Sequence, residues 1–521
     1  MDALPPQNEH IRNRAEHWDA EQIWGHRFHN EQTPWLILLE FLTLFRSRWY
    51  TETVQPLNEP REAGLHEQIH YNLPRAKHLR YLIFNNPYLQ HIEETVTSNK
   101  EQWRRWRETM ADAPFSEDLG YLQERFESFS RFIRVVELFQ NTALEPHRQR
   151  RWTSRFLFPY GPDCLYADTR PEKKHNGIGT PDRRFFARTG ELLYLMLNRS
   201  QRGAEVAEAI GQKLMDESNP WNQLARALQP EGIPPDPDPI QGTNIGYLPY
   251  PERREYDALA EDWLALLQME MPGASLLDPL MRITGLHLIL YMLRRAQEEV
   301  GEAENGHRLV LEVAPPRKTL LFELSRETYD ANRNLPQRAL EAYLERARSG
   351  KAWQYLHTQN APAEAAVEYL KRILWWQPKE DPKGGSPDKV FDFMKKSSLN
   401  RHGQHVGKVV PDWSYEIGLS ARRGGIGTWY SPNDTFLKAL VMTAVDEREE
   451  YHRFLGRLYE RYGLIIGVTE AERAYGQLPT DERTFVDNAA RLEQRLRTLG
   501  LLHRLSDDCA YVQNPFKADR P

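Results

Sequence analysis

Residues 484–512 read TFVDNAARLEQRLRTLGLLHRLSDDCAYV. Apolar residues recur in the first half of this stretch at helical spacing: Phe485, Leu492, Leu496 and Leu499. The spacing predicts a helix with one apolar face over 484–499, and Gly500 follows as its C-terminal turn. Two short apolar runs, 501–505 and 510–512, flank Ser506-Asp507-Asp508 and predict a β-hairpin. The stretch therefore predicts a helix that leads directly into a hairpin.

Two more helices are predicted just before this stretch, over 435–445 and 449–462. The resulting order over 432–516 is helix, helix, helix, hairpin. This is the layout of a winged helix, in which the third helix recognises a groove of DNA and the hairpin is the wing. The phrase Arg491-Leu492-Glu493, followed by Leu499-Gly500-Leu501-Leu502, also resembles the common ending of such modules.

The rest of the chain predicts a mainly α fold, a multi-helix body with irregular basic insertions. Helical periodicity is clearest over 117–144, where Ser116 is the expected N-cap. Clusters of proline and glycine mark the expected boundaries. We expect a helical domain at 1–229, a proline-rich linker at 230–250, a second helical domain at 251–377 and a basic glycine-rich segment at 378–431, with short strands at 406–410 and 415–419.

Composition excludes several classes of protein. The 521 residues are 40% hydrophobic and 27% charged, which gives ample core material. No run of about 18 uncharged apolar residues predicts a membrane span, and the N-terminus has no apolar region of the kind found in signal peptides. The two cysteines, Cys164 and Cys509, predict neither a disulfide framework nor a cysteine-rich zinc site. We therefore expect a cytoplasmic protein without a membrane partner.

Two segments are basic, although the whole chain has a net charge of -6. Segment 146–188 carries ten basic and four acidic residues, and segment 383–423 carries eight basic and four acidic residues. Arginine and lysine beside aromatic or glycine residues can track a phosphate backbone. The alternatives are that the first segment's aromatics are core residues and that the second segment is a solvated linker. The residues predicted to bind nucleic acid are Arg148, Arg150, Arg151, Arg155, Lys395, Lys396, Arg401, Lys408, Arg422, Arg423, Arg491 and Arg495.

The predicted third helix is itself neutral. Four arginines within 481–497 are balanced by four acidic residues. A helix that reads DNA usually has a basic excess around it, because phosphate contacts supply much of the affinity. Two readings therefore stay open, a DNA-binding winged helix and a winged helix that contacts protein.

Motifs that carry chemistry are scarce. The sequence has no phosphate-binding loop, no nucleophile elbow and no His-Glu-x-x-His motif, so we expect no cofactor and no metal. His402 and His405 form a His-x-x-His pair near Asp412, and these three residues could act in metal or acid–base chemistry. A second His-x-x-His pair, His26 and His29, is more typical of a packing or surface feature.

Two passages resemble the large helical components of bacterial anti-phage defence operons. They are Asp182-Arg183-Arg184-Phe185-Phe186-Ala187-Arg188 with the following 190–197, and Trp429-Tyr430-Ser431-Pro432-Asn433-Asp434. The resemblance implies an accessory subunit that works with protein partners in a multi-subunit complex.

These observations lead to one main hypothesis and two alternatives. The main hypothesis is a non-enzymatic, DNA-engaging subunit of a multi-protein bacterial system for anti-phage defence. The first alternative is a protein-interaction scaffold that uses a neutral winged helix. The second is a metal-dependent enzyme around His402 and His405.

Overall fold

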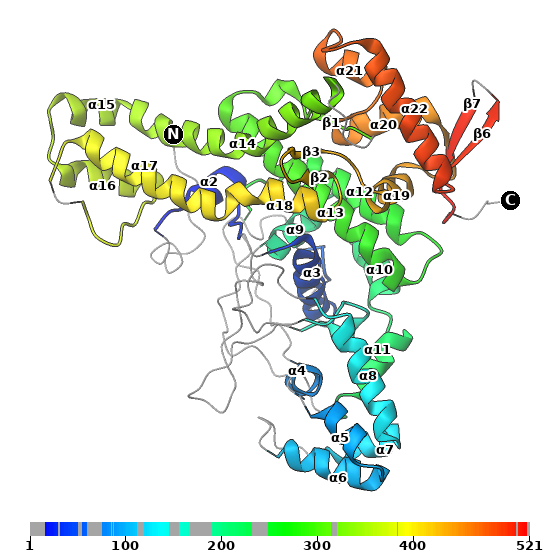
Figure 1. Ribbon diagram of the computed structural model, residues 1–521. Helices are drawn as coiled ribbons and strands as arrows, with labels where there is room; N and C mark the ends of the chain where they lie inside the picture. The colour runs from blue at the N-terminus through cyan, green and yellow to red at the C-terminus, as the bar shows by residue number, and fades with distance from the viewer. Residues whose placement is uncertain are drawn as a thin grey trace.

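The structure is a computed structural model, and the protein is mainly helical. The described residues are 16–29, 32–50, 55–59, 76–84, 86, 88–111, 119–144, 156–166, 189–231, 248–313, 320–382, 384–506 and 509–517. Figure 1 shows a central group of helices from which three parts project. The central helices are α2 Asp19–Trp24, α3 Pro34–Trp49, α9 Thr189–Arg199, α10 Gly203–Leu214, α12 Arg254–Leu267, α13 Gly273–Val300, α14 Leu320–Ser349, α18 Val409–Glu416 and α19 Asp434–Ala444.

Helices α3 and α13 form the middle of the core. Helix α3 begins at Pro34, where the Thr33 hydroxyl accepts a hydrogen bond from the Leu36 amide at 3.4 Å. Helix α13 is long and apolar enough to cross a membrane, but 89% of its most apolar window is buried inside the protein. Burial of this kind is that of a core helix. The short 3₁₀ helix η2, Ala303–Asn305, follows α13.

The core does not follow the expected boundary at 230–250. One continuous cluster of buried residues includes Leu36 of α3, Leu280 of α13 and Leu437 of α19. Helices α3 and α13 are apolar on most of their circumference, so each is covered by helices from both sides of that boundary. The expected domains 1–229 and 251–377 therefore share one core. Residues 232–247 of the expected linker lie outside the described residues.

A second cluster of buried residues belongs to the part at the bottom of Figure 1. Its elements are α4 Lys77–Phe84, α5 Leu89–Thr95, α6 Asn99–Thr109, α7 Gly120–Phe126, α8 Phe129–Asn141, η1 Pro162–Cys164 and α11 Pro220–Ala227. The single helix predicted over 117–144 is two helices, because the chain breaks at Glu127, whose φ is 56°. The expected cap, Ser116, lies outside the described residues.

The second projecting part is helical where the sequence predicted an irregular segment. It consists of α15 Lys351–Thr358, α16 Ala363–Leu374 and α17 Pro387–Gln404, and the 3₁₀ helix η3, Val406–Lys408, follows α17. Buried residues of α17 recur at helical spacing: Val390, Phe391, Met394, Ser398 and His402. The prediction of an irregular segment over 378–431 was therefore wrong for most of its length.

The strands are short and lie near the C-terminus. β1 Leu309–Val310 pairs in parallel with β5 Leu464–Ile465, and β2 Ser420–Arg423 pairs with β3 Gly427–Tyr430. The strand predicted at 406–410 is instead η3 and the start of α18, and the strand predicted at 415–419 is the end of α18 and the turn after it. The buried residues Val409, Val410 and Trp413 share one face of α18, as helical spacing allows.

The third projecting part, at the upper right of Figure 1, contains the C-terminal elements. After α19 come β4 Arg448–Glu450, α20 Tyr451–Tyr462, β5, α21 Val468–Tyr475, α22 Glu482–Thr498, β6 Leu502–Ser506 and β7 Cys509–Gln513. β4, β7 and β6 form an antiparallel sheet in that order. The helices and hairpin expected over 435–512 are present, whereas β4, β5 and α21 were not predicted.

Candidate functional site

The residues predicted to bind nucleic acid are only partly described. Arg148, Arg150, Arg151 and Arg155 lie outside the described residues. The described end of that basic segment, residues 156–166, contributes Phe156, Leu157 and Tyr166 to the buried clusters. These aromatics therefore belong to the core, which agrees with the alternative considered for them.

The basic residues of 383–423 do not form one free cationic surface. Lys395 donates to Glu345 at 2.8 Å, and Arg422 lies 3.2 Å from Asp412. Arg401 lines a hollow between helices, described below. Lys396, Lys408, Arg422 and Arg423 are exposed. Two of the described candidates in this segment, Lys395 and Arg422, are thus already paired with an acidic residue of the protein.

The two candidates on α22 differ in their surroundings. Nε of Arg495 lies 2.6 Å from the Asp434 carboxylate, and the same guanidinium donates to the Pro432 carbonyl at 2.9 Å. Arg495 therefore fastens α22 to the start of α19, although its side chain remains 29% exposed. Arg491 is exposed, and its side chain makes no ion pair within the described part of the chain.

Two further arginines share the exposed side of α22 with Arg491. Arg483 and Arg497 are also exposed, and neither is ion-paired to a described residue. Steps of three and four residues connect 483, 487, 491, 494 and 497, so these residues lie on one helix face. Asp487 is the acidic residue among them. The sequence count gives a neutral helix because it includes every charged residue of 481–497. It does not show which of these residues are ion-paired in the fold.

The orientation of α22 is fixed by one buried side chain. Asn488, fully buried, donates to the carbonyls of Leu311 and Ile466 at 2.9 and 3.0 Å, and its Oδ1 accepts from the Val313 amide at 3.0 Å. Leu311 and Val313 follow β1 and Ile466 follows β5. These hydrogen bonds fix the buried side of α22 to the body of the protein, and they thereby fix the direction in which its exposed face points.

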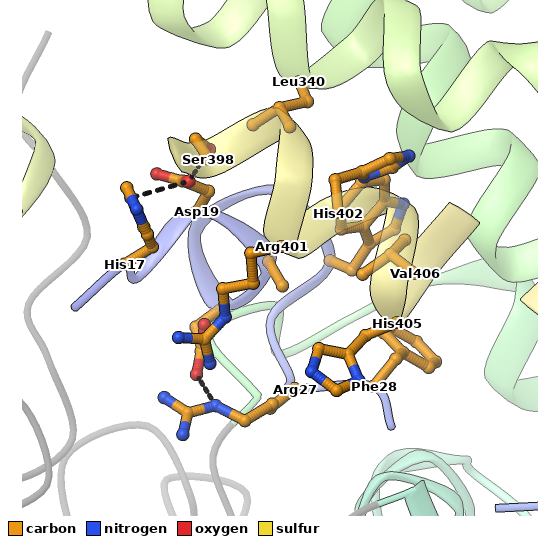
Figure 2. A pocket seen from close by; sticks show the side chains of 13 residues that line it. His17, Asp19, Arg27, Phe28, Leu340, Ser398, Arg401, His402, His405 and Val406 are labelled. Carbon is orange, nitrogen blue, oxygen red and sulfur yellow. Dashed lines mark hydrogen bonds and ion pairs between the residues drawn. The ribbon is translucent and has the colours of Figure 1, made fainter. Parts of the chain in front are cut away.

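His402 and His405 line a hollow between α2 and α17 (Figure 2). The hollow encloses about 390 Å³ of space, part of it open to solvent. The rings of His29 and His405 lie 4.7 Å apart, centre to centre, and the ring of His402 lies 6.3 Å from that of Trp24. Sequence spacing predicted neither contact, because the two motifs are far apart in the chain.

One end of the hollow holds a buried carboxyl group. Asp19 accepts a hydrogen bond from the Ser398 hydroxyl, and its Oδ2 lies 3.6 Å from Nδ1 of His17. Burial raises the pKa of Asp19 and lowers the pKa of His17. Both shifts favour the neutral forms, so this end of the hollow carries little charge.

The other end holds two guanidinium groups, those of Arg27 and Arg401 (Figure 2). Nε of Arg27 donates to the carboxylate of Glu21. Burial lowers the pKa of Arg401, and the nearby Arg27 lowers it further. The carboxyl groups of Glu21, Asp19 and Glu16 act on the pKa of Arg401 in the opposite direction.

The residues considered for metal or acid–base chemistry do not converge. His402 and His405 line the hollow, but Asp412 pairs with Arg422, which also stacks over Tyr415 at 4.9 Å. Burial lowers the pKa of His402 to about 4. Among the residues that the structure describes, no three His, Cys, Asp or Glu side chains are grouped to hold a metal ion.

No protein-family model, curated protein or solved structure matches this chain. Its geometry offers two candidate sites, the exposed face of α22 and the hollow between α2 and α17. The first is a convex charged surface and the second is a small concave site, and they suit different partners.

Proposed function

We propose that the protein is a non-enzymatic, DNA-engaging subunit and that residues 432–516 act as a winged helix. The order α19, β4, α20, α22, β6, β7 supports this proposal, as does the pairing of β4 with β7. In a winged helix the last helix enters the major groove and the hairpin lies beside it. Here α22 is that helix, and β5 and α21 are additions before it.

The observation that carries the proposal is the unpaired basic face of α22. Arg483, Arg491 and Arg497 are exposed and unpaired within the described residues, whereas Arg457, Arg461 and Arg473 of α20 and α21 each form an ion pair. Arginines without an internal partner can each contact a phosphate or a base edge without first breaking an ion pair. Asp487 reduces this charge but leaves a basic excess among the five face positions.

A triple variant tests the proposal directly. Arg483→Gln, Arg491→Gln and Arg497→Gln together remove the three charges and leave the buried side of α22 unchanged. We expect the affinity for duplex DNA, measured by fluorescence anisotropy at low salt, to fall by more than about tenfold. DNA binding that the triple variant retains in full would contradict the assignment of this face.

The matched control removes three exposed arginines elsewhere. Arg104, Arg105 and Arg131 lie on α6 and α8 of the part at the bottom of Figure 1, far from α22. Their triple glutamine variant has the same net charge as the test variant. It should bind DNA within about twofold of the wild type, because charges beyond a Debye length are largely screened.

A second candidate function is binding of a protein partner through the same module. It is favoured by two exposed apolar side chains, Val486 on α22 and Leu505 on β6, which are 49% and 71% exposed. Exposed apolar residues beside arginines are typical of protein interfaces. If the module binds a protein, Val486→Asp should weaken the complex strongly. If it binds DNA, the arginine variants should lose more affinity for DNA than Val486→Asp does.

The resemblance of 182–197 and 429–434 to components of anti-phage defence operons supports a place in a multi-protein bacterial system. Residues 189–197 lie in the buried helix α9, and Trp429 and Tyr430 are buried in β3. A role beside protein partners fits a chain whose proposed DNA contacts are confined to one module. Co-purification of the chain with the product of a neighbouring gene would test this part of the proposal.

A further inference from the structure

The guanidinium end of the α2–α17 hollow has N–H donors that the described residues around it do not pair. Arg27 follows α2 and Arg401 is in the last turn of α17, and both side chains face the hollow (Figure 2). Two like charges held close together in a half-buried site repel each other, so folding must hold them there against this force. An arrangement of this kind becomes favourable when an anion is shared between the two cations.

The hydrogen-bonding capacity of these arginines is also incompletely used. Arg27 Nε donates to Glu21, but the buried Nη2 of Arg27 has no hydrogen-bond acceptor within the described part of the chain. The half-buried Arg401 side chain makes neither a hydrogen bond nor an ion pair with any residue that the structure describes. Buried N–H groups are nearly always paired in proteins, so the missing acceptors indicate a place for one.

The carboxyl groups nearby do not supply those acceptors. Glu21 has one oxygen on Arg27, and its side chain is 6% exposed. Asp19 is held by Ser398 and His17, and burial raises its pKa, which favours the neutral acid. Glu16 accepts a hydrogen bond from the Ser397 hydroxyl at 2.8 Å. These carboxyl groups act on Arg401 through the electrostatic field, but none of the three accepts a hydrogen bond from it.

We propose that the Arg27–Arg401 end of the hollow binds one oxyanion group of a small ligand, a phosphate or a carboxylate. Planar guanidinium groups present paired N–H donors that match the oxygens of both groups. Trp24 and Phe28 form an apolar wall beside the site, and the open side leaves room for the rest of a ligand. This site is separate from the exposed face of α22, so it stands whether or not the protein binds DNA.

Isothermal titration calorimetry of the full chain tests the proposal, with inorganic phosphate and acetate as titrants at constant chloride ionic strength. Binding of phosphate alone assigns a phosphate ligand, and binding of acetate alone assigns a carboxylate. Arg401→Gln should weaken the observed binding by about tenfold or more, because one charge-assisted pair is lost. Arg423→Gln, an exposed arginine outside the hollow, should leave it unchanged. Absence of binding by both anions would overturn the proposal.

Thermal unfolding of the same variants in the absence of phosphate and acetate separates a binding role from a structural one. If Arg401 awaits an anion, Arg401→Gln breaks no hydrogen bond or ion pair of the described structure and should unfold at about the same temperature as the wild type. Arg401→Lys keeps the charge and should retain part of the binding. An Arg401→Gln protein that unfolds at a clearly lower temperature would make Arg401 a structural residue and overturn the proposal.

Discussion

Oδ2 of Asp262 lies 2.6 Å from Nε2 of His287 at a fully buried position between α12 and α13. The same oxygen accepts a hydrogen bond from the Tyr462 hydroxyl at 2.7 Å, and Oδ1 pairs with Arg461. Tyr462 and Arg461 end α20, so this carboxylate joins the C-terminal module to the central helices. This attachment is polar and buried. Removing one of its partners would leave the others unpaired in the core and destabilise the fold.

Replacing Asp262 should destabilise the protein strongly. Asp262→Leu leaves three buried or half-buried donors without an acceptor, and we expect the free energy of unfolding to fall by about 3–5 kcal/mol. Urea denaturation measures this loss. Arg461→Gln is the control, because the Arg461 side chain is 30% exposed and its removal should cost clearly less. Equal effects of the two substitutions would mean that the carboxylate does not organise the cluster.

Asn488 should prove equally important for the position of α22. Asn488→Leu has nearly the same volume but leaves two carbonyls and one amide unpaired in the core. We expect a loss of about 2–4 kcal/mol in the free energy of unfolding, measured by denaturation. Gln494→Leu on the exposed side of α22 should change stability by less than about 0.5 kcal/mol. Unchanged stability of Asn488→Leu would show that α22 is held by apolar contacts alone.

Arg491 and Arg495 should separate cleanly into a surface role and a structural role. Arg491→Ala is expected to weaken DNA binding with little change in stability. Arg495→Ala breaks the contacts to Asp434 and Pro432 and should lower stability by up to about 1 kcal/mol, with a smaller effect on DNA affinity. Thermal unfolding measures the stability of both variants, and fluorescence anisotropy measures their affinity for DNA. A larger loss of stability in Arg491→Ala and a larger loss of DNA affinity in Arg495→Ala would contradict this assignment.

The buried His402 predicts a dependence of stability on pH. Its pKa is lowered from 6.5 to about 4 by burial, while nearby Glu341 acts in the opposite direction. Between these values the unfolded chain binds a proton that the folded chain does not. The contribution of His402 to stability is therefore complete above pH 6.5 and is lost as the pH falls toward 4, with a slope of up to about 1.4 kcal/mol per pH unit.

Comparison of the wild type with His402→Gln isolates this contribution from that of other groups. Denaturation curves between pH 4 and 7 should show a shallower dependence on pH for the variant. The buried His307, whose pKa is also lowered to about 4, will keep part of the slope in both proteins. Parallel curves for the two proteins would mean that His402 is not shielded from solvent as the structure places it.

The sequence predicted elements with a clear helical period better than elements rich in glycine and charge. Phe485, Leu492 and Leu496 located α22 correctly, and all three are buried. The helical period of α17 is present in Val390, Phe391 and Met394, but lysines and glycines around these residues obscure it in the sequence. The break at Glu127 has no sequence signal of this kind, because it depends on how α7 and α8 pack on each other.

The candidate sites show the same limit. Composition identified arginines near the C-terminus, but whether each is paired depends on distant partners such as Asp434 for Arg495. Arg27 and Arg401 line the same hollow, although they are far apart in the sequence. Residue patterns within a short stretch of sequence cannot indicate that two such distant residues lie together. The expected domains share one core. The apolar residues around α13 indicate that this helix is buried, but they do not indicate which helices it packs against.

In the proposed function, the exposed face of α22 binds DNA through phosphate contacts. The most direct measurement is the affinity of the wild type and of the Arg483, Arg491 and Arg497 triple glutamine variant for a short duplex across a salt titration. Each phosphate contact should contribute about 0.9 to the slope of log affinity against log salt, so the variant's slope should be shallower by about 2–3. No binding by the wild type at low salt, or identical slopes for the two proteins, would contradict the claim.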